Sequence, residues 1–94
     1  MPEARWRGVT LARSPRCPRV DGHLYFPPDT VELQYLRPST TRTRCPHKGE
    51  ACYFDVVVGG AVLRDAAWCY PDPLPAARAI RDHVAFWRGV EVLP

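Results

Sequence analysis

The stretch ACYFDVVVGGAVLR, residues 51–64, decides the fold class. Its first part, residues 51–58, carries aromatic and β-branched side chains in succession, which is typical of a β-strand. Gly59 and Gly60 follow at once and fit a two-residue hairpin turn of type I′, because that turn needs positive φ at both positions. The stretch therefore predicts an antiparallel hairpin as the clearest element of a β-sheet.

The turn also predicts the register of this hairpin. Val58 would face Ala61, and Asp55 would face Arg64, which makes an opposite-charge pair across the two strands. The return strand is expected to break near Asp65 and then to resume.

The prolines indicate how the rest of the chain is organised. There are 11 of them, which exclude long helices and mark turns between short strands. Residues 37–49 are expected to be mostly turn and coil, and residues 75–82 form the only predicted helix. Further strands are predicted at residues 6–12, 23–26, 30–36, 84–87 and 90–93. We therefore predict one domain over residues 1–94, mainly β with a minor α part: a twisted, partly closed antiparallel sheet with one short helix.

Composition limits the classes of function. The chain has 94 residues, of which 46% are hydrophobic, as expected for a single packed domain. The net charge of +3 comes from cations scattered among acids, whereas a nucleic-acid-binding surface needs clustered cations. No apolar run approaches the roughly 18 residues of a membrane helix, and the N-terminus lacks the apolar region of a secretory signal. We expect a cytoplasmic protein that binds neither nucleic acid nor membrane.

The segment TRTRCPHKGEACYF, residues 41–54, concentrates reactive side chains. Cys45 and His47 are metal-ligand types, but zinc sites usually show paired ligands such as C-x-x-C, and none occurs here. Cys52 and Cys69 lie in apolar strands, where a thiol usually packs as a small hydrophobic group. The sequence therefore predicts neither a metal ion nor another cofactor.

Two nucleophiles are possible in the same segment. Cys45 has Arg44, His47 and Lys48 close in sequence, and cationic neighbours lower the pKa of a thiol. Lys48 is the only lysine in a chain with 13 cationic side chains, and a compact ammonium is the form that catalytic or anion-binding sites use. A small enzyme using Cys45 or Lys48 is one hypothesis, and a Cys45 that simply packs under the turn before Pro46 is its structural alternative.

A ligand pocket is the interpretation that we favour. Trp68 and Tyr70 share one face if their strand continues, and aromatic residues with polar tips suit sites that meet a ligand. A concave sheet would hold a small planar ligand, polar or anionic, next to Lys48. Other available aromatic residues are Tyr53, Phe86 and Trp87, and His23 is given no role. The predicted ligand-binding residues are Lys48, Trp68, Tyr70, Tyr25, Arg44 and Ser39.

Several separate motifs together resemble the domain of unknown function 427 family. They are VDGHLYFPPDTV, LRPSTTRTRCPHKGEACY, DAAWCYPDPLPAA and DHVAFWRGVEV, and the resemblance runs from about Val9 to the C-terminus. It implies a tent-like, twisted antiparallel sheet with one short helix. That arrangement is similar to the Mss4-like zinc proteins, methionine sulfoxide reductase B and the cereblon ligand-binding domain, which holds its ligand in a tryptophan cage. No function comes with the resemblance.

Matches and departures from the family pattern sharpen the candidate residues. Matching positions include Tyr25, Phe26, Pro27, Ser39, Thr43, Cys45, Pro46, Lys48, Gly49, Ala51, Tyr53, Trp68, Tyr70, Pro71 and Pro73. This chain has His47 in place of an aromatic residue, Cys52 in place of Ser, Cys69 in place of Tyr and Asp21 in place of Glu. The departures argue against a zinc site and leave Cys45 and Lys48 as the reactive groups of the motif. A protein-interaction module is a third hypothesis, for which an exposed apolar patch would be the sign.

Overall fold

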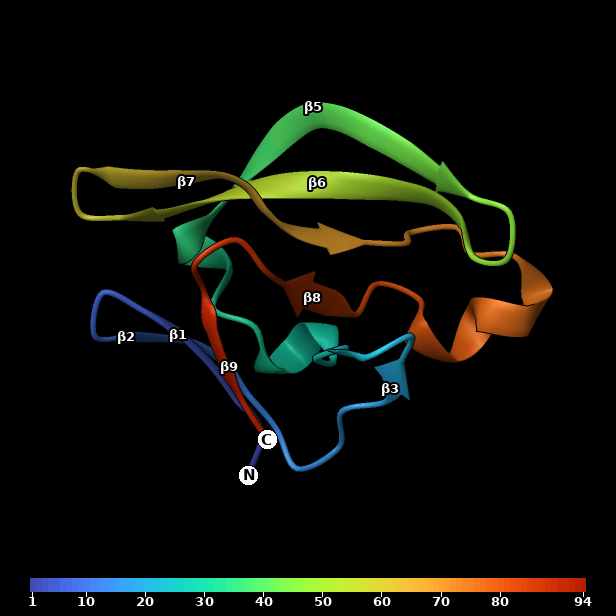
Figure 1. Ribbon diagram of the computed structural model, residues 1–94, viewed down its shortest axis with the longest axis horizontal. Coiled ribbons are helices and arrows are strands. Elements are labelled where there is room, and N and C mark those ends of the chain that lie inside the picture. The colour runs from blue at the N-terminus through green and yellow to red at the C-terminus, as the bar shows by residue number, and fades with distance from the viewer.

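The predicted mainly β class is confirmed by a computed structural model that describes all 94 residues (Figure 1). The strands pair only in antiparallel fashion and form sheets in the orders β2-β1-β9, β3-β4 and β5-β6-β7-β8. The elements are β1 (Glu3–Trp6), β2 (Val9–Arg13), β3 (Arg19–Val20), β4 (His23–Leu24), β5 (Leu36–Cys45), β6 (Gly49–Val58), β7 (Ala61–Cys69), β8 (Val84–Phe86), β9 (Glu91–Leu93) and three 3₁₀ helices, η1 (Pro28–Thr30), η2 (Leu33–Tyr35) and η3 (Pro75–Ile80).

The central hairpin of β6 and β7 is confirmed, with Val58 opposite Ala61 as predicted. The turn type is different from the prediction. Gly59 has a φ of 59°, but Gly60 is not in the positive-φ region. Positive φ at the first central position alone is the pattern of a type II′ turn, which also matches the twist of hairpin strands.

The predicted pairing of Asp55 with Arg64 is wrong because β7 is bulged. Phe54 pairs with Ala67, so the segment around Asp65 bulges out of register opposite Asp55. The buried Asp55 carboxylate accepts a hydrogen bond from the backbone N–H of Asp65 at 2.9 Å. It also accepts one at 3.1 Å from Arg37, its partner on β5. The opposite-charge pair therefore forms with the strand on the other side of β6, and the break near Asp65 is confirmed as a bulge.

The prediction is wrong in three other segments. The predicted strand over residues 6–12 is a hairpin, because Arg7 and Gly8 both take positive φ and reverse the chain between β1 and β2. Residues 30–36 contain the end of η1 and all of η2 instead of a strand. Residues 37–45 are strand β5 and not coil. This strand lies at the edge of its sheet with no buried side chain, so it lacks the apolar alternation that predicts a strand.

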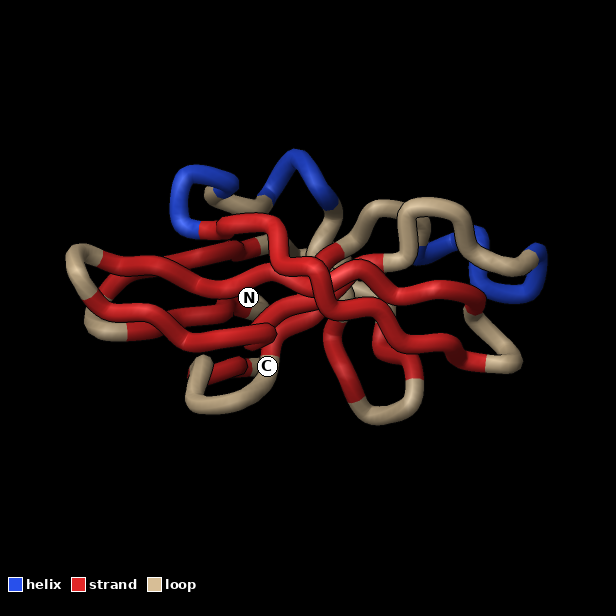
Figure 2. Tube along the Cα trace, turned by 90° about the horizontal axis from the view of Figure 1, so that it is seen from above, coloured by secondary structure: helices blue, strands red, loops and turns tan.

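The short helix predicted at residues 75–82 is present, but it is shorter than predicted and is not an α-helix. It is the 3₁₀ helix η3, which has a proline in its first turn and ends at Ile80. Figure 2 shows the strands running along the molecule with the short helices at its rim. None of the helices is long and apolar enough to cross a membrane.

Two apolar clusters form the core. The larger contains Leu11, Phe26, Val56 and Phe86, and it joins the β1-β2 hairpin to the four-stranded sheet. The smaller is built on Trp68 and includes the following buried residues: Tyr25, Ala51, Tyr70, Ile80 and Ala85. Because the second cluster contains several aromatic residues with polar atoms, it is the part of the core suited to meet a ligand.

The turn between β5 and β6 depends on Gly49. Its φ is 107°, and an added Cβ would lie 3.4 Å from the backbone oxygen of Asp72 and the backbone nitrogen of Leu74. We predict that Gly49→Ala lowers the free energy of unfolding by about 2–3 kcal/mol, because a φ of 107° lies well outside the left-handed region at about +57° that alanine can adopt. Gly8→Ala is the matched control, since Gly8 has a φ of 77° with open space around it, and it should cost about 1 kcal/mol. Urea denaturation measures both, and equal losses would contradict the structural role given to Gly49.

Candidate functional site

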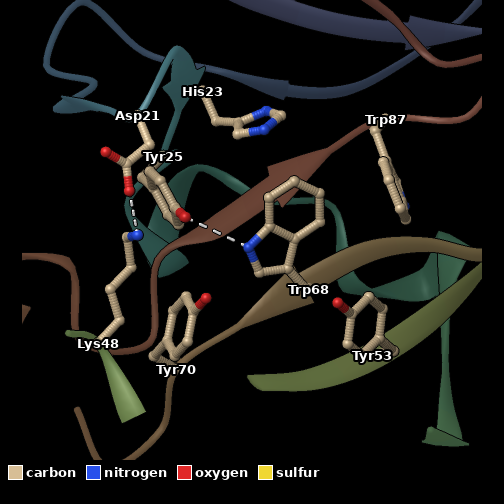
Figure 3. Close-up of a pocket in the computed structure, with 8 residues that line it drawn as sticks. All are labelled: Asp21, His23, Tyr25, Lys48, Tyr53, Trp68, Tyr70 and Trp87. Carbon is tan, nitrogen blue, oxygen red and sulfur yellow. Dashed lines mark hydrogen bonds and ion pairs between the residues drawn. The ribbon is translucent and has the colours of Figure 1, made fainter. Parts of the chain in front are cut away.

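Eight side chains from separate segments surround one pocket of about 260 Å³ (Figure 3). The β3-β4 hairpin and the residue after it provide one side, β6, β7 and the residue after β7 provide another, and the turn after β5 and the segment after β8 close the rim. The lining residues are Asp21, His23, Tyr25, Lys48, Tyr53, Trp68, Tyr70 and Trp87.

Trp68 is the centre of the aromatic wall. Its ring meets His23 at 4.9 Å, Trp87 at 5.6 Å, and Tyr25 and Tyr53 at 6.3 Å each, measured between ring centroids. Three of these contacts are edge-to-face, the geometry that aromatic quadrupoles favour. The indole N–H of Trp68 donates to the hydroxyl of Tyr25 at 3.3 Å, so the buried nitrogen is satisfied. Trp68 is therefore held in one position by four rings.

The rings beside Trp68 are themselves fixed by the backbone and by hydrogen bonds. Tyr53 lies directly opposite Trp68 in the β6-β7 register, and its hydroxyl is 3.0 Å from the hydroxyl of Thr43. The indole N–H of Trp87 donates to the carbonyl of Asp65 at 2.7 Å, at the bulge of β7. The wall is thus set by strand pairing before any ligand binds.

Two buried phenols keep their protons at neutral pH. Burial raises the pKa of Tyr70 to about 12, and it also raises the pKa of Tyr25. A protonated phenol can donate a hydrogen bond, and the Tyr25 hydroxyl already accepts one from Trp68. The pocket wall therefore offers hydroxyl donors between its apolar faces.

Lys48 supplies the cationic group of the pocket. Its residue is only 9% exposed, and its ammonium donates to the carboxylate of Asp21, with which it forms an ion pair. This hydrogen bond raises the pKa of Lys48 and lowers the pKa of Asp21. Asp21 and Gly22 have φ of 50° and 82°, so a tight turn of positive φ presents the carboxylate at the rim. The Asp21 side chain is 73% exposed. Its carboxylate can therefore leave Lys48 and be solvated by water when a ligand takes its place at the ammonium.

Cys45 lies beside the pocket but does not line it. Its sulfur is 3.8 Å from the Lys48 ammonium, and it packs against the cluster around Trp68. The backbone N–H of His47 lowers the pKa of the Cys45 thiol, with a smaller contribution from the N–H and charge of Lys48. The geometry thus combines an ionisable thiol and an ammonium, next to a pocket that only the ammonium enters.

Four of the six predicted ligand-binding residues come together: Lys48, Trp68, Tyr70 and Tyr25 all line the pocket. Arg44 and Ser39 do not. Because side chains alternate along β5, Arg44 borders a different hollow together with Glu50 and Asp72. The Ser39 hydroxyl accepts a hydrogen bond from the backbone N–H of Thr41 within β5.

Asp21 and His23 are pocket residues that the sequence did not predict. The Asp-Gly pair signals a turn, but nothing local says that this turn meets Lys48, which is 27 residues away in sequence. The sequence identifies Tyr53 and Trp87 only as available aromatic residues. The alternation of β6 and the pairing of Tyr53 with Trp68 were the signals that could have placed Tyr53.

A second hollow of about 270 Å³ lies across the Lys48-Asp21 ion pair, which lines both. Its other walls are mostly apolar and come from the β3 region and η3: Pro18, Val20, Ala76, Ala77, Ala79 and Ile80, with His47. No group of three His, Cys, Asp or Glu side chains is arranged to hold a metal ion.

Comparison with known proteins identifies the family. A family model described as "Domain of unknown function (DUF427)" matches residues 3–93, which is nearly the whole chain. A search among curated proteins found no match. The chain belongs to the DUF427 family.

Proposed function

We propose that this chain is a small-molecule-binding module of the cytoplasm, and that a small planar ligand, polar or anionic, binds in the pocket around Trp68. The observation that carries the proposal is the combination of a fixed aromatic wall with the buried ammonium of Lys48. Ligand sites are typically apolar hollows with a few well-placed polar groups, and this pocket has that composition.

The size of the pocket supports a small ligand. Its volume of about 260 Å³ is near the low end of the roughly 300–1,000 Å³ that is usual for small-molecule sites. One ring with short substituents fits such a volume, and a planar ring can contact Trp68 and Tyr53, whose own rings are tilted by 35° to each other. The aromatic wall therefore favours a flat ligand over a branched one.

The polar rim supports a ligand that accepts hydrogen bonds. Lys48 stays protonated because its pKa is raised by Asp21, so it can donate to a carboxylate, a phosphate or a carbonyl. An anionic group would replace the exposed Asp21 carboxylate at the ammonium. A neutral group with a carbonyl and an N–H would instead contact Lys48 and Asp21 together. In both cases Lys48 is the required donor.

A comparison of matched carboxylates and amides tests the proposal. We predict that planar aromatic carboxylates bind the wild-type protein, as seen by ligand-observed NMR, and bind at least tenfold more weakly to Lys48→Met. Methionine preserves the length and packing of the side chain but removes the charge. Arg44→Met is the control, because it removes a cation outside the pocket and should leave binding unchanged.

Each of the two comparisons, between variants and between ligands, has a result that would contradict or narrow the proposal. If no member of the ligand set binds, or if Lys48→Met and Arg44→Met weaken binding equally, Lys48 does not hold a ligand in this pocket. If the neutral amides bind as well as the carboxylates and both need Lys48, the ligand is polar without being anionic.

A small enzyme that uses Cys45 is the second candidate. The lowered pKa of Cys45 favours it, because the thiolate is the nucleophilic form. Lys48 is the weaker nucleophile here, since its pKa is raised and a protonated ammonium has no lone pair with which to attack. The position of Cys45 outside the pocket wall makes this candidate second to binding.

Alkylation measures the reactivity of Cys45. We predict that iodoacetamide modifies Cys45 faster than Cys17 at pH 7, because burial raises the pKa of the Cys17 thiol while backbone N–H groups lower that of Cys45. Peptide mapping by mass spectrometry gives both rates in one sample. Should Cys45 react no faster than Cys17, the nucleophile hypothesis loses its basis.

The protein-interaction hypothesis stays a prediction. The large apolar side chains that are exposed come from five separate segments: Met1, Leu33, Val62, Trp87 and Leu93. Of these, Trp87 already belongs to the pocket.

A further inference from the structure

Cys52 and Cys69 lie directly opposite each other on neighbouring strands. They are Cα partners in the antiparallel register of β6 and β7, one position from the pair of Tyr53 and Trp68. Directly opposed residues point to the same face of a sheet, with Cα atoms about 4.5–5.5 Å apart. A disulfide usually has Cα atoms about 4.4–6.8 Å apart, so the strand pairing already meets the Cα requirement for a bond.

The pair is separate from the pocket and from the other thiols. Alternation along the strands puts Cys52 and Cys69 on the face opposite to Tyr53 and Trp68, and both contact the larger apolar cluster. Cys45 is instead the last residue of β5. The Cys17 thiol donates to the carbonyl of Ser14 at 3.5 Å. All four cysteines are free thiols.

We propose that Cys52 and Cys69 form a reversible disulfide across β6 and β7 when the protein meets an oxidised low-molecular-weight thiol. The bond would join the two strands that carry the aromatic wall of the pocket. The inference does not depend on the identity of any ligand.

The reaction proceeds by two thiol-disulfide exchanges, with oxidised glutathione as the co-reactant. The thiolate of the half-buried Cys52 attacks one sulfur of the oxidised glutathione, breaks its S–S bond and releases one glutathione thiolate. The thiol of Cys69 then loses its proton and attacks the sulfur of Cys52, which expels the second glutathione as its thiolate. The protein loses two hydrogen atoms, and one oxidised glutathione becomes two reduced molecules.

The surroundings assign the two roles. Cys69 is the more buried thiol, with 8% exposure, so it is shielded from the large oxidant and acts as the resolving group. Burial raises the pKa of Cys69 to about 11; the neighbouring Cys52 and Asp82 add to this, and Arg42 opposes it. The second exchange is therefore slow at neutral pH and accelerates about tenfold for each unit of rising pH.

Sheet geometry makes the bond easy to reverse. Opposed Cβ atoms in a sheet are about 4.5–5.5 Å apart, whereas a disulfide prefers about 3.5–4.5 Å. The bond would draw the strands slightly together, and such bonds are the more reducible ones. Dithiothreitol should restore both thiols without unfolding the protein.

The test uses the full chain incubated with oxidised glutathione, followed by blocking of the remaining thiols and peptide mapping. We expect one intramolecular Cys52–Cys69 disulfide in the wild type and in Cys17→Ser/Cys45→Ser, formed faster at pH 8.5 than at pH 7 and reversed by dithiothreitol. In Cys69→Ser, a glutathione adduct should persist on Cys52. Tryptophan fluorescence checks that each variant is folded.

Three results would overturn the proposal. The first is a wild-type protein that stays fully reduced. The second is a glutathione adduct on Cys52 that never resolves while Cys69 is present. The third is a bond that forms only between other cysteines or between two chains, seen on a non-reducing gel.

Discussion

The packing of four rings around Trp68 is the interaction on which the candidate site depends. His23, Tyr25, Tyr53 and Trp87 reach Trp68 from segments far apart in sequence, and the hydrogen bond from its indole to Tyr25 satisfies its one buried donor. Edge-to-face contacts add to the burial of apolar surface and fix orientation as well. The pairing of β6 with β7 sets this arrangement, because it places the Tyr53 ring opposite Trp68 on the pocket face of the sheet. The main hairpin of the fold and the wall of the pocket are therefore the same structure.

The charged rim results from two tight turns that face each other. One turn has positive φ at Asp21 and Gly22, and the other ends at Gly49, whose φ of 107° is strained for any residue with a Cβ. The backbone of Leu74 also donates to the carbonyl of Lys48 at 2.9 Å, which anchors the turn. Lys48 is thus held from both directions, and its ammonium stays at the aromatic wall even though Asp21 is exposed.

Local patterns predicted the parts of the fold that depend on neighbouring residues. The β6-β7 hairpin could be predicted from the sequence because its strands carry buried side chains and its turn contains two glycines. Strand β5 could not be predicted, because an edge strand with no buried side chain has no apolar alternation. The same division holds for the site. Lys48, Trp68, Tyr70 and Tyr25 could be predicted from residue type. The meeting of Asp21 with Lys48 instead depends on tertiary structure, and the alternation of β5 turns Arg44 away from the pocket.

Native mass spectrometry of the protein purified from its own cells tests the central claim most directly. Wild type and Lys48→Met would be measured side by side under conditions that preserve non-covalent complexes. We predict an organic molecule bound to the wild type and lost from the variant, with both proteins folded. The same bound mass on both proteins would contradict the role of Lys48, and a wild type without any bound molecule would contradict the pocket as a site of stable ligand binding.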